Sequence, residues 1–328
     1  MRNTTISVNH TWIKNLYQGR GLLPQVFTPV LALYAKDTPS LSNQNLKPFS
    51  VLQENRSVLL GPGDADQTEP WHILALRGCV QIQAATLSRV KKVDLRKVNV
   101  DYKTQRCTFI LWKYTSAFFY VFPGSTVPYI QEVKKAALLG GKGANRLEPG
   151  FYTDLTLGIH QEGKPRGHVA LRQTARRPIR RSKGKPFYNQ KDPLYFSNPY
   201  DNLHASWNSQ PHTAGYASAG CLVISGIPNC PLHSQSKAQG PWKKFIELFL
   251  KANQKKAKLL LIPAAFCAKS DVGNLTESFP QKLIYGQVGP KIAAWQKQLK
   301  AQGLYKGKIN GQLTSSTYKI ACQQGLLK

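Results

Sequence analysis

Short apolar runs fill the middle of the chain, beginning just after Glu69. Most are four to eight residues long and rich in Val, Ile, Phe and Tyr, which is typical of strands. The pattern predicts strands at HILALRGCVQIQ, VNVDY, CTFILWKY, AFFYVF, HVALRQT and GCLVISG. Thr115 and Ser116 separate CTFILWKY from AFFYVF, which favours a β-hairpin, and Pro123 and Gly124 are expected to end its second strand. The next segment, KAALLGGKGANRLEPGFY, contains several glycines and is expected to be a loop.

One helix is predicted over GPWKKFIELFLKANQKKAK, residues 240–258. Apolar residues recur there at steps of three and four, as on one face of a helix. They are Trp242, Phe245, Ile246, Phe249 and Leu250. We expect an amphipathic helix that packs on the sheet.

Two further helices are predicted near the C-terminus. Ile292, Trp295 and Leu299 share one face of the first, which is expected to end at Gly303 in a left-handed C-cap. An Asn-Gly pair at 310–311 then predicts a tight turn, and Ser or Thr residues are suited to cap the short helix that follows. The spacing alone describes a compact helical unit.

These patterns divide the chain into three regions: 1–68, 69–275 and 282–328. The first is rich in Asn, Ser, Pro and Gln, and its role is not indicated by its residues. It contains LLPQVFTPVLALYA, residues 22–35, which resembles a secretory signal but is interrupted by prolines. We therefore expect no standard export signal, and no apolar stretch reaches the roughly 18 to 20 residues of a membrane span.

The charge indicates an anionic partner. Lys and Arg number 45 against 16 Asp and Glu, which gives a net charge of +29. Nucleic acid, anionic membrane surfaces and acidic cell-wall polymers all attract such a protein. Basic residues are densest in RQTARRPIRRSKGKP, which is either a solvated loop or an anion-binding segment. Aromatic residues are not interleaved with this run, so specific nucleic-acid binding is not expected.

Cys221 is the candidate nucleophile among six scattered cysteines. No CxxC pair is present, so neither a zinc ribbon nor a metal site is expected. A reactive thiol needs a nearby base and backbone N–H groups for the oxyanion. Gly220 permits a tight turn before Cys221, the apolar LVI after it predicts a buried strand, and His204 lies seventeen residues upstream. The alternative is an inert cysteine of the core.

The arrangement of His204, Ser218, Gly220 and Cys221 resembles the signature of the L,D-transpeptidases, the YkuD-type cysteine enzymes that remodel peptidoglycan. PGSTVP, EPGFYTDLTLGIH, GHVALRQT and DNLHASW extend the resemblance over about residues 70 to 270. It implies that His204 is the base, that Cys221 is the nucleophile, and that the amides of Gly220 and Cys221 bind the oxyanion. The sequence departs from the family where Ala219 replaces a second histidine and where Leu222 and Val223 follow the cysteine.

The resemblance also suggests residues that line the cleft. The candidates for substrate binding are Ser218, His212, Arg172, Gln173 and His168. His160 is a further residue expected at the cleft, and Arg172 or Gln173 is suited to a substrate carboxylate. His212 is either a substitute base or an exposed loop residue beside Pro211.

The C-terminal region resembles the peptidoglycan-binding domain of the first type. The matching positions are Val288, Gln298, Leu299, Gly303, Tyr305, Gly307, Ile309, Gly311, Thr317, Ala321, Gln324 and Leu326. Asn310 stands where that family usually has Asp, and Leu313 replaces the usual Phe. The resemblance implies a small helical module that binds the wall.

Together the two resemblances imply an α+β chain: a mainly β L,D-transpeptidase-like catalytic domain followed by a small helical peptidoglycan-binding domain. A tetrapeptide stem would acylate Cys221 with release of D-Ala, and an amine or water would resolve the thioester. No cofactor is expected; the partners are peptidoglycan and possible anionic wall polymers. The place of action would be the periplasm, the wall or the outside, reached by an atypical signal, lysis or injection. The alternative function is a non-catalytic peptidoglycan-binding protein with a degenerate site.

Overall fold

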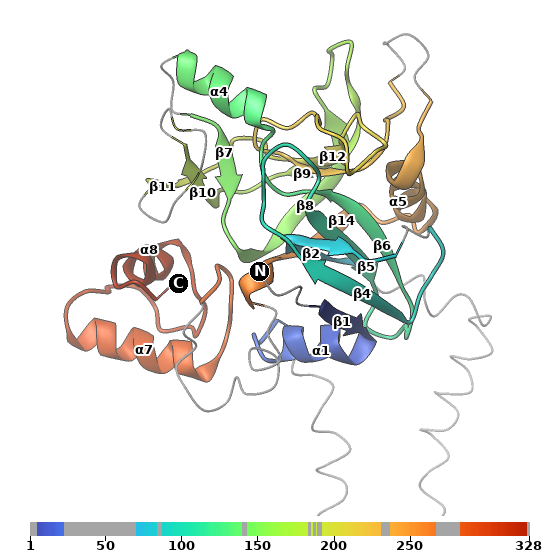
Figure 1. Ribbon diagram of the computed structural model, residues 1–328. Helices are drawn as coiled ribbons and strands as arrows, with labels where there is room; N and C mark the ends of the chain where they lie inside the picture. Colours follow the sequence, from blue (N-terminus) through green and yellow to red (C-terminus); the bar gives the residue numbers. More distant parts are fainter. Residues whose placement is uncertain are drawn as a thin grey trace, which may run out of the picture.

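The computed structural model describes residues 5–22, 70–83, 87–139, 143–182, 185, 188, 192–230, 237–266 and 283–326. The fold is mixed α+β and mainly β, as expected. Eight of the described strands close into a barrel (Figure 1). Around the barrel they are β12 (Leu203–Ala205), β13 (Leu222–Ile224), β6 (Phe119–Ser125), β5 (Cys107–Trp112), β2 (His72–Arg77), β14 (Lys256–Pro263), β8 (Gly150–His160) and β9 (His168–Gln173).

The strands β2 and β5 are buried on both faces. Alternate residues point to opposite faces of a strand, so each strand supplies two cores. Ile73 and Phe109 belong to a core shared with the helix α5 (Gly240–Lys251), whereas Leu74 and Ile110 belong to a core shared with the N-terminal segment. This double burial explains why both strands are almost continuously apolar in the sequence.

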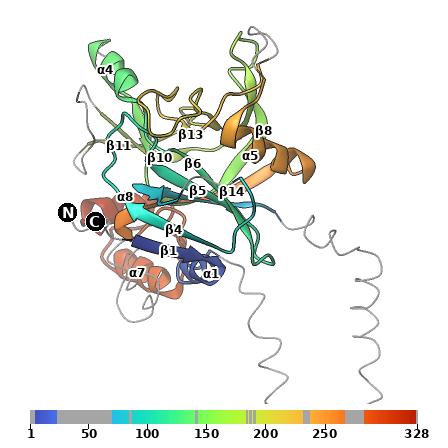
Figure 2. The same ribbon diagram turned by 45° about the vertical axis from the view of Figure 1, so that its right-hand side comes forward.

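The N-terminal segment is part of this fold, which its composition did not indicate. The strand β1 (Thr5–Asn9) pairs with β4 (Lys92–Lys97), and β4 pairs with β3 (Cys79–Gln81). The helix α1 (His10–Gln18) follows directly, and Asn9 caps it by accepting a hydrogen bond from the Trp12 amide at 2.8 Å. Figure 2 shows β1 and β4 side by side above α1. The segments DTPSLSNQNLKP and LGPGDADQTEP, whose composition favours loops, are residues 37–48 and 60–70, and they lie outside the described residues apart from Pro70.

The basic run contains a strand with buried arginines. A third sheet has the order β11 (Leu194–Ser197), β10 (Arg177–Arg181), β7 (Asn145–Leu147). Arg177 is paired with Asp154 at 2.8 Å, and Arg180 with Glu148 at 2.9 Å. Because both guanidinium groups are buried and paired, this part of the run is not the solvated loop that was one of the two expectations.

Several boundaries differ from the predictions. The β5–β6 hairpin is confirmed, but β6 continues through Pro123 and Gly124 to Ser125. Gly124 is required there, because a Cβ atom would lie 2.1 Å from the Val223 carbonyl oxygen of the neighbouring strand. VNVDY forms no strand. The expected loop at 135–152 instead holds the end of α4 (Ile130–Leu138), β7 and the start of β8.

The helix predicted over 240–258 is confirmed only as far as Lys251. The chain turns after Lys251, and Lys256 begins β14. Trp242, Phe245, Ile246 and Phe249 are buried as expected, but Leu250 is 51% exposed. The next described element is the short 3₁₀ helix η2 (Ala264–Phe266).

Two helices end the chain, α7 (Pro290–Ala301) and α8 (Ser315–Gln323), and they lie together at the lower left of Figure 1. Ile292, Trp295 and Leu299 belong to their shared core, and Thr314 caps α8 in a capping box. Leu194 and Phe196 of β11 pack against this core, so the helical segment contacts the third sheet.

Gln296 holds the Asn310–Gly311 turn. Its Oε1 accepts hydrogen bonds from the Asn310 and Gly311 amides at 3.0 and 2.8 Å, and its Nε2 donates to the Gln312 carbonyl at 2.9 Å. Gln296 is fully buried, whereas Gln298, the glutamine matched in the sequence, is exposed. The amide that organises this segment is therefore two residues earlier than the resemblance suggested.

Candidate active site

Four neighbouring strands bring the predicted catalytic residues together. β12 and β13 run parallel, with His204 opposite Val223. Cys221 directly precedes β13, so it lies at the same end of this strand pair as His204. β9 pairs with β12, and β8 pairs with β9 with His160 opposite His168. Residues far apart in sequence thus converge at one side of the barrel.

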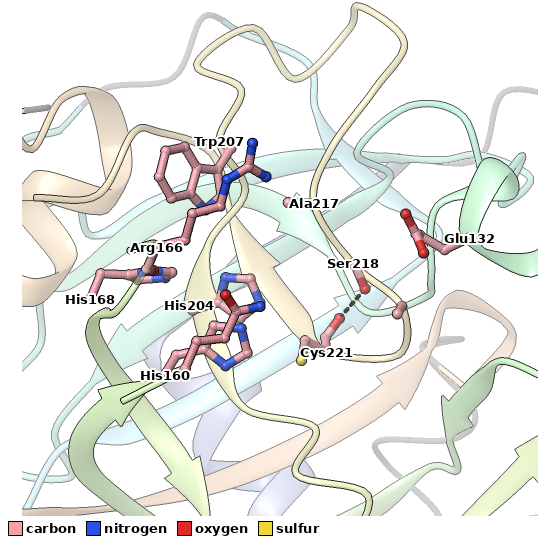
Figure 3. A pocket seen from close by; sticks show the side chains of 11 residues that line it. Glu132, His160, Arg166, His168, His204, Trp207, Ala217, Ser218 and Cys221 are labelled. Atoms are coloured by element: carbon pink, nitrogen blue, oxygen red, sulfur yellow. Dashed lines mark hydrogen bonds between the residues drawn. The ribbon is translucent and has the colours of Figure 1, made fainter. Parts of the chain in front are cut away.

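The strands border an open cleft of about 270 Å³. Figure 3 shows the histidines on one side, Ser218 and Glu132 on the other, and Cys221 at the lower edge. The lining residues are Glu132, His160, Gln161, Arg166, His168, His204, Trp207, Ala217, Ser218, Ala219 and Cys221. A cleft that contains a thiol and three imidazoles has the groups that acyl transfer needs.

His204 is positioned as a neutral base. One of its ring nitrogens lies within 4.8 Å of the Cys221 sulfur. Its Nδ1 lies 2.7 Å from the Ala205 carbonyl oxygen, which can only accept a hydrogen bond. Burial, followed by the neighbouring His160 and His168, holds the pKa of His204 well below its usual value. The ring is therefore uncharged at neutral pH, and Nε2 carries a free lone pair.

The turn before Cys221 depends on Gly220. Gly220 has φ +152°, a conformation that other residues rarely adopt. A Cβ atom there would lie 2.6 Å from Asp201 Oδ1 and 2.8 Å from Asn145 Cβ. Ser218 closes the turn by donating a hydrogen bond from Oγ to the Cys221 carbonyl at 2.6 Å. The sequence expectation that a glycine shapes this turn therefore has a steric reason.

The Cys221 thiol is protonated at rest. Burial, and then the carboxylate of Asp201, raise the pKa of Cys221 above its usual value. The S–H group donates to the Tyr200 carbonyl oxygen at 3.7 Å. A preformed thiolate is thus disfavoured, so any reaction at this sulfur would require the thiol to lose its proton first.

The two expected oxyanion donors differ in their availability. The Gly220 amide donates to Ser218 Oγ at 3.3 Å. The Cys221 amide makes no hydrogen bond to another of the described residues. The Cys221 amide is therefore the better placed donor, and Gly220 would have to leave Ser218 to contribute.

A cluster of three histidines borders the sulfur, and two of them were expected only as cleft residues. The His160 and His204 rings stack with centroids 4.2 Å apart, and His168 lies edge-on to both at 5.3 Å. Burial lowers the pKa of His160 to about 4, with His168 and Arg172 as further causes. Burial also lowers the pKa of His168. All three rings are therefore neutral at pH 7.

The other predicted substrate-binding residues divide into two groups. Ser218 and His168 line the cleft. His212 is exposed and does not line it, as the loop interpretation expected. Arg172 is also outside the lining and pairs with Glu162 at 3.3 Å. Gln173 is buried and accepts a hydrogen bond from the Asp201 amide at 2.9 Å, so its role is to hold the chain before β12.

Five lining residues were missed from the sequence, namely Glu132, Gln161, Arg166, Trp207 and Ala217. Arg166 lies over the Trp207 ring with 5.5 Å between its Cζ and the ring centroid, and Glu132 faces them from α4. Trp207 has φ +60°, an uncommon conformation for a residue other than glycine. Arg166 is thus a guanidinium that lines the cleft, whereas Arg172 does not.

The described residues also include a possible metal site. His160, His204 and Cys221 each offer a ligand atom, and the three atoms lie within 4.8 Å of one another. Nitrogen and sulfur donors suit Zn²⁺ and other soft ions. The cluster therefore offers three donors of the kind that such an ion would use.

Comparison of the chain with protein-family models, curated proteins and solved structures gave no match. Within the described part of the chain, every helix is too short or too polar to cross a membrane.

Proposed function

We propose that this protein is a cysteine acyltransferase of the L,D-transpeptidase type that acts on peptidoglycan. The observation that carries the proposal is the placement of His204 within 4.8 Å of the Cys221 sulfur in an open cleft. The neutral imidazole, the protonated thiol and the Ser218–Gly220 turn all fit a nucleophile activated by a general base.

In the first step, the Cys221 thiol gives its proton to His204 Nε2, and the sulfur attacks a peptide carbonyl of the stem. The carbonyl π electrons move to oxygen, and the Cys221 amide donates to that oxyanion. When the carbonyl re-forms, the C–N bond breaks, and the proton from His204 passes to the leaving amine of D-Ala. The product is a thioester on Cys221.

In the second step, an amine of another stem or a water molecule attacks the thioester. His204 takes the proton of the attacking group, the C–S bond breaks, and the proton returns to the sulfur. An amine gives a crosslink, and water gives a shortened stem. Arg166 and Glu132 both line the cleft. In this proposal Arg166 would bind a stem carboxylate, and Glu132 would bind an ammonium group.

The substrate polymer carries many carboxylates, and the net charge of +29 suits it. The α7–α8 segment would add affinity for the wall, in line with its resemblance to a peptidoglycan-binding domain. Peptidoglycan lies outside the cytoplasm, so we propose that the protein works in the periplasm, in the wall or outside the cell.

The test is incubation of the purified protein with a disaccharide tetrapeptide of defined sequence, followed by mass spectrometry of the protein and the products. The proposal expects a mass gain on Cys221 equal to the substrate minus alanine, and then a crosslinked or a shortened product. Cys221→Ser should show no thioester, and Cys322→Ser is the matched control that keeps it. An unmodified protein and an unchanged substrate would reject the enzyme.

The second candidate is a wall-binding protein without activity. The raised pKa of Cys221 and the S–H bond to Tyr200 favour it, since both oppose ionisation of the thiol. Treatment with iodoacetamide separates the two functions. Selective labelling of Cys221 that is lost in His204→Ala supports the enzyme, whereas slow labelling together with sedimentation on purified cell walls supports the binding protein.

A further inference from the structure

Two stacked imidazoles beside the Cys221 sulfur are held as opposite neutral tautomers, with the proton on Nδ1 of one ring and on Nε2 of the other. His160 ends β8 and His204 lies in β12, and their ring planes differ by only 13°. Figure 3 shows both rings close to the sulfur of Cys221. In a neutral imidazole one nitrogen donates and the other accepts, and the partner of one nitrogen decides the state of both.

His204 carries its proton on Nδ1. The Ala205 carbonyl oxygen, 2.7 Å away, accepts only, so Nδ1 must be the donor. The lone pair is then on Nε2, and His204 can accept a proton but cannot donate a hydrogen bond from that nitrogen. This is the state required of a base.

His160 carries its proton on Nε2. Asn202 Oδ1 accepts a hydrogen bond from the Gln173 amide at 2.9 Å, which fixes the orientation of the Asn202 side chain. The Nδ2 group of Asn202 therefore donates to His160 Nδ1, also at 2.9 Å. Because Nδ1 accepts, the proton of the neutral ring must be on Nε2, and His160 presents an N–H donor.

A donor is what the sulfur needs when it ionises. The Tyr200 carbonyl and the Asp201 carboxylate near Cys221 both repel a negative sulfur, whereas the backbone amides of Asn202 and Cys221 favour it. His168 cannot donate a hydrogen bond to the sulfur, because its Nδ1 donates to the Arg166 carbonyl at 2.7 Å and its Nε2 is left with a lone pair. Of the three rings in the cluster, His160 alone has its free nitrogen protonated.

We propose that His160, oriented by Asn202, is a second catalytic imidazole that donates its Nε2–H to the Cys221 sulfur while His204 removes the thiol proton. This inference rests on the proposed acyl transfer. No proton is transferred from His160: the thiol proton moves to His204 Nε2, and the electron pair remains on sulfur until the C–S bond forms. A ring nitrogen of His160 lies within 4.8 Å of the sulfur, and the ring must move closer for its Nε2–H to form this contact, as is common when a substrate binds.

Two experiments test the proposal, and neither needs peptidoglycan. Nitrogen-15 NMR of the wild-type protein at pH 7 reports which ring nitrogen of each histidine is protonated, and it should show Nδ1–H for His204 and Nε2–H for His160. The second measurement is the rate at which iodoacetamide alkylates Cys221. His160→Phe keeps an aromatic ring in the stack but removes the donor, so the rate should fall about tenfold, the equivalent of one pKa unit.

His160→Gln restores an N–H donor and should recover part of the rate, and His212→Phe is the matched control at an exposed histidine outside the cleft. A proton on Nδ1 of His160, or equal alkylation of His160→Phe and His212→Phe, would overturn the inference. Should His160→Phe not fold, the wild-type spectrum and His160→Gln decide. Correct protonation states and fast alkylation without acylation by the stem would instead refute the proposed function.

Discussion

Asp201 offers a direct test of the electrostatics around Cys221. Its side chain is 3% exposed, Oδ1 receives a weak hydrogen bond from Asn145 Nδ2 at 3.4 Å, and Oδ2 has no partner among the described residues. Burial raises the pKa of Asp201 from 3.8 to about 6, although Asn145, Arg177 and Arg181 partly oppose this. Replacing it with Asn removes the charge and keeps the shape, and the new amide could also donate to Asn145 Oδ1, which has no partner within the described part of the chain.

The expected effect on stability depends on pH with a definite sign. The folded protein holds the Asp201 proton more tightly than the unfolded chain, so the wild type loses stability as the pH rises from about 3.8 to 6. A difference of about two pKa units corresponds to about 3 kcal/mol. Asp201→Asn should therefore have the larger free energy of unfolding by about 3 kcal/mol at pH 8, and this gain should disappear near pH 3.5.

Urea unfolding of both proteins at several pH values measures the difference. Asp94→Asn is the control of opposite sign, because a hydrogen bond from Ser7 lowers the pKa of Asp94 on the exposed strand β4. That variant should be less stable than the wild type at pH 8 and equal to it at low pH. An Asp201→Asn gain that is constant with pH, or a loss at pH 8, would refute the description of Asp201 as a buried, poorly solvated carboxylate.

Three further outcomes are expected. Gln296→Ala should lower the free energy of unfolding by about 1 to 3 kcal/mol, because it leaves the buried Gly311 amide unpaired, while the exposed Gln298→Ala should change it by less than about 0.5 kcal/mol in the same urea titration. Gly220→Ala should slow acylation and destabilise the protein, whereas Gly215→Ala, where no atom lies within 4 Å of the new Cβ, should show only the cost of its φ of +102°. Added Zn²⁺ should slow alkylation of Cys221 by iodoacetamide, and a chelator should reverse this; an unchanged rate would show that the three donors do not bind the ion.

The sequence suggested the pair His204 and Cys221 through its resemblance to a family signature. Each residue adjoins a short apolar run, and those runs became β12 and β13, which pair directly in parallel. The β5–β6 hairpin and the helices α7 and α8 were predicted from periodicity, turn residues and caps within short windows. Signals of this kind survive folding because the residues that produce them remain neighbours.

The positions that only the tertiary structure decided depend on contacts between distant segments. His160 reaches the sulfur through the pairing of β8, β9, β12 and β13, and its protonation state is set by Asn202, 42 residues later in the chain. The burial of Arg177 in a strand follows from its pairing with Asp154 rather than from its basic neighbours. The spacing of apolar residues shows which face of an element is buried, but it does not show which other segment covers that face or which donor meets which acceptor.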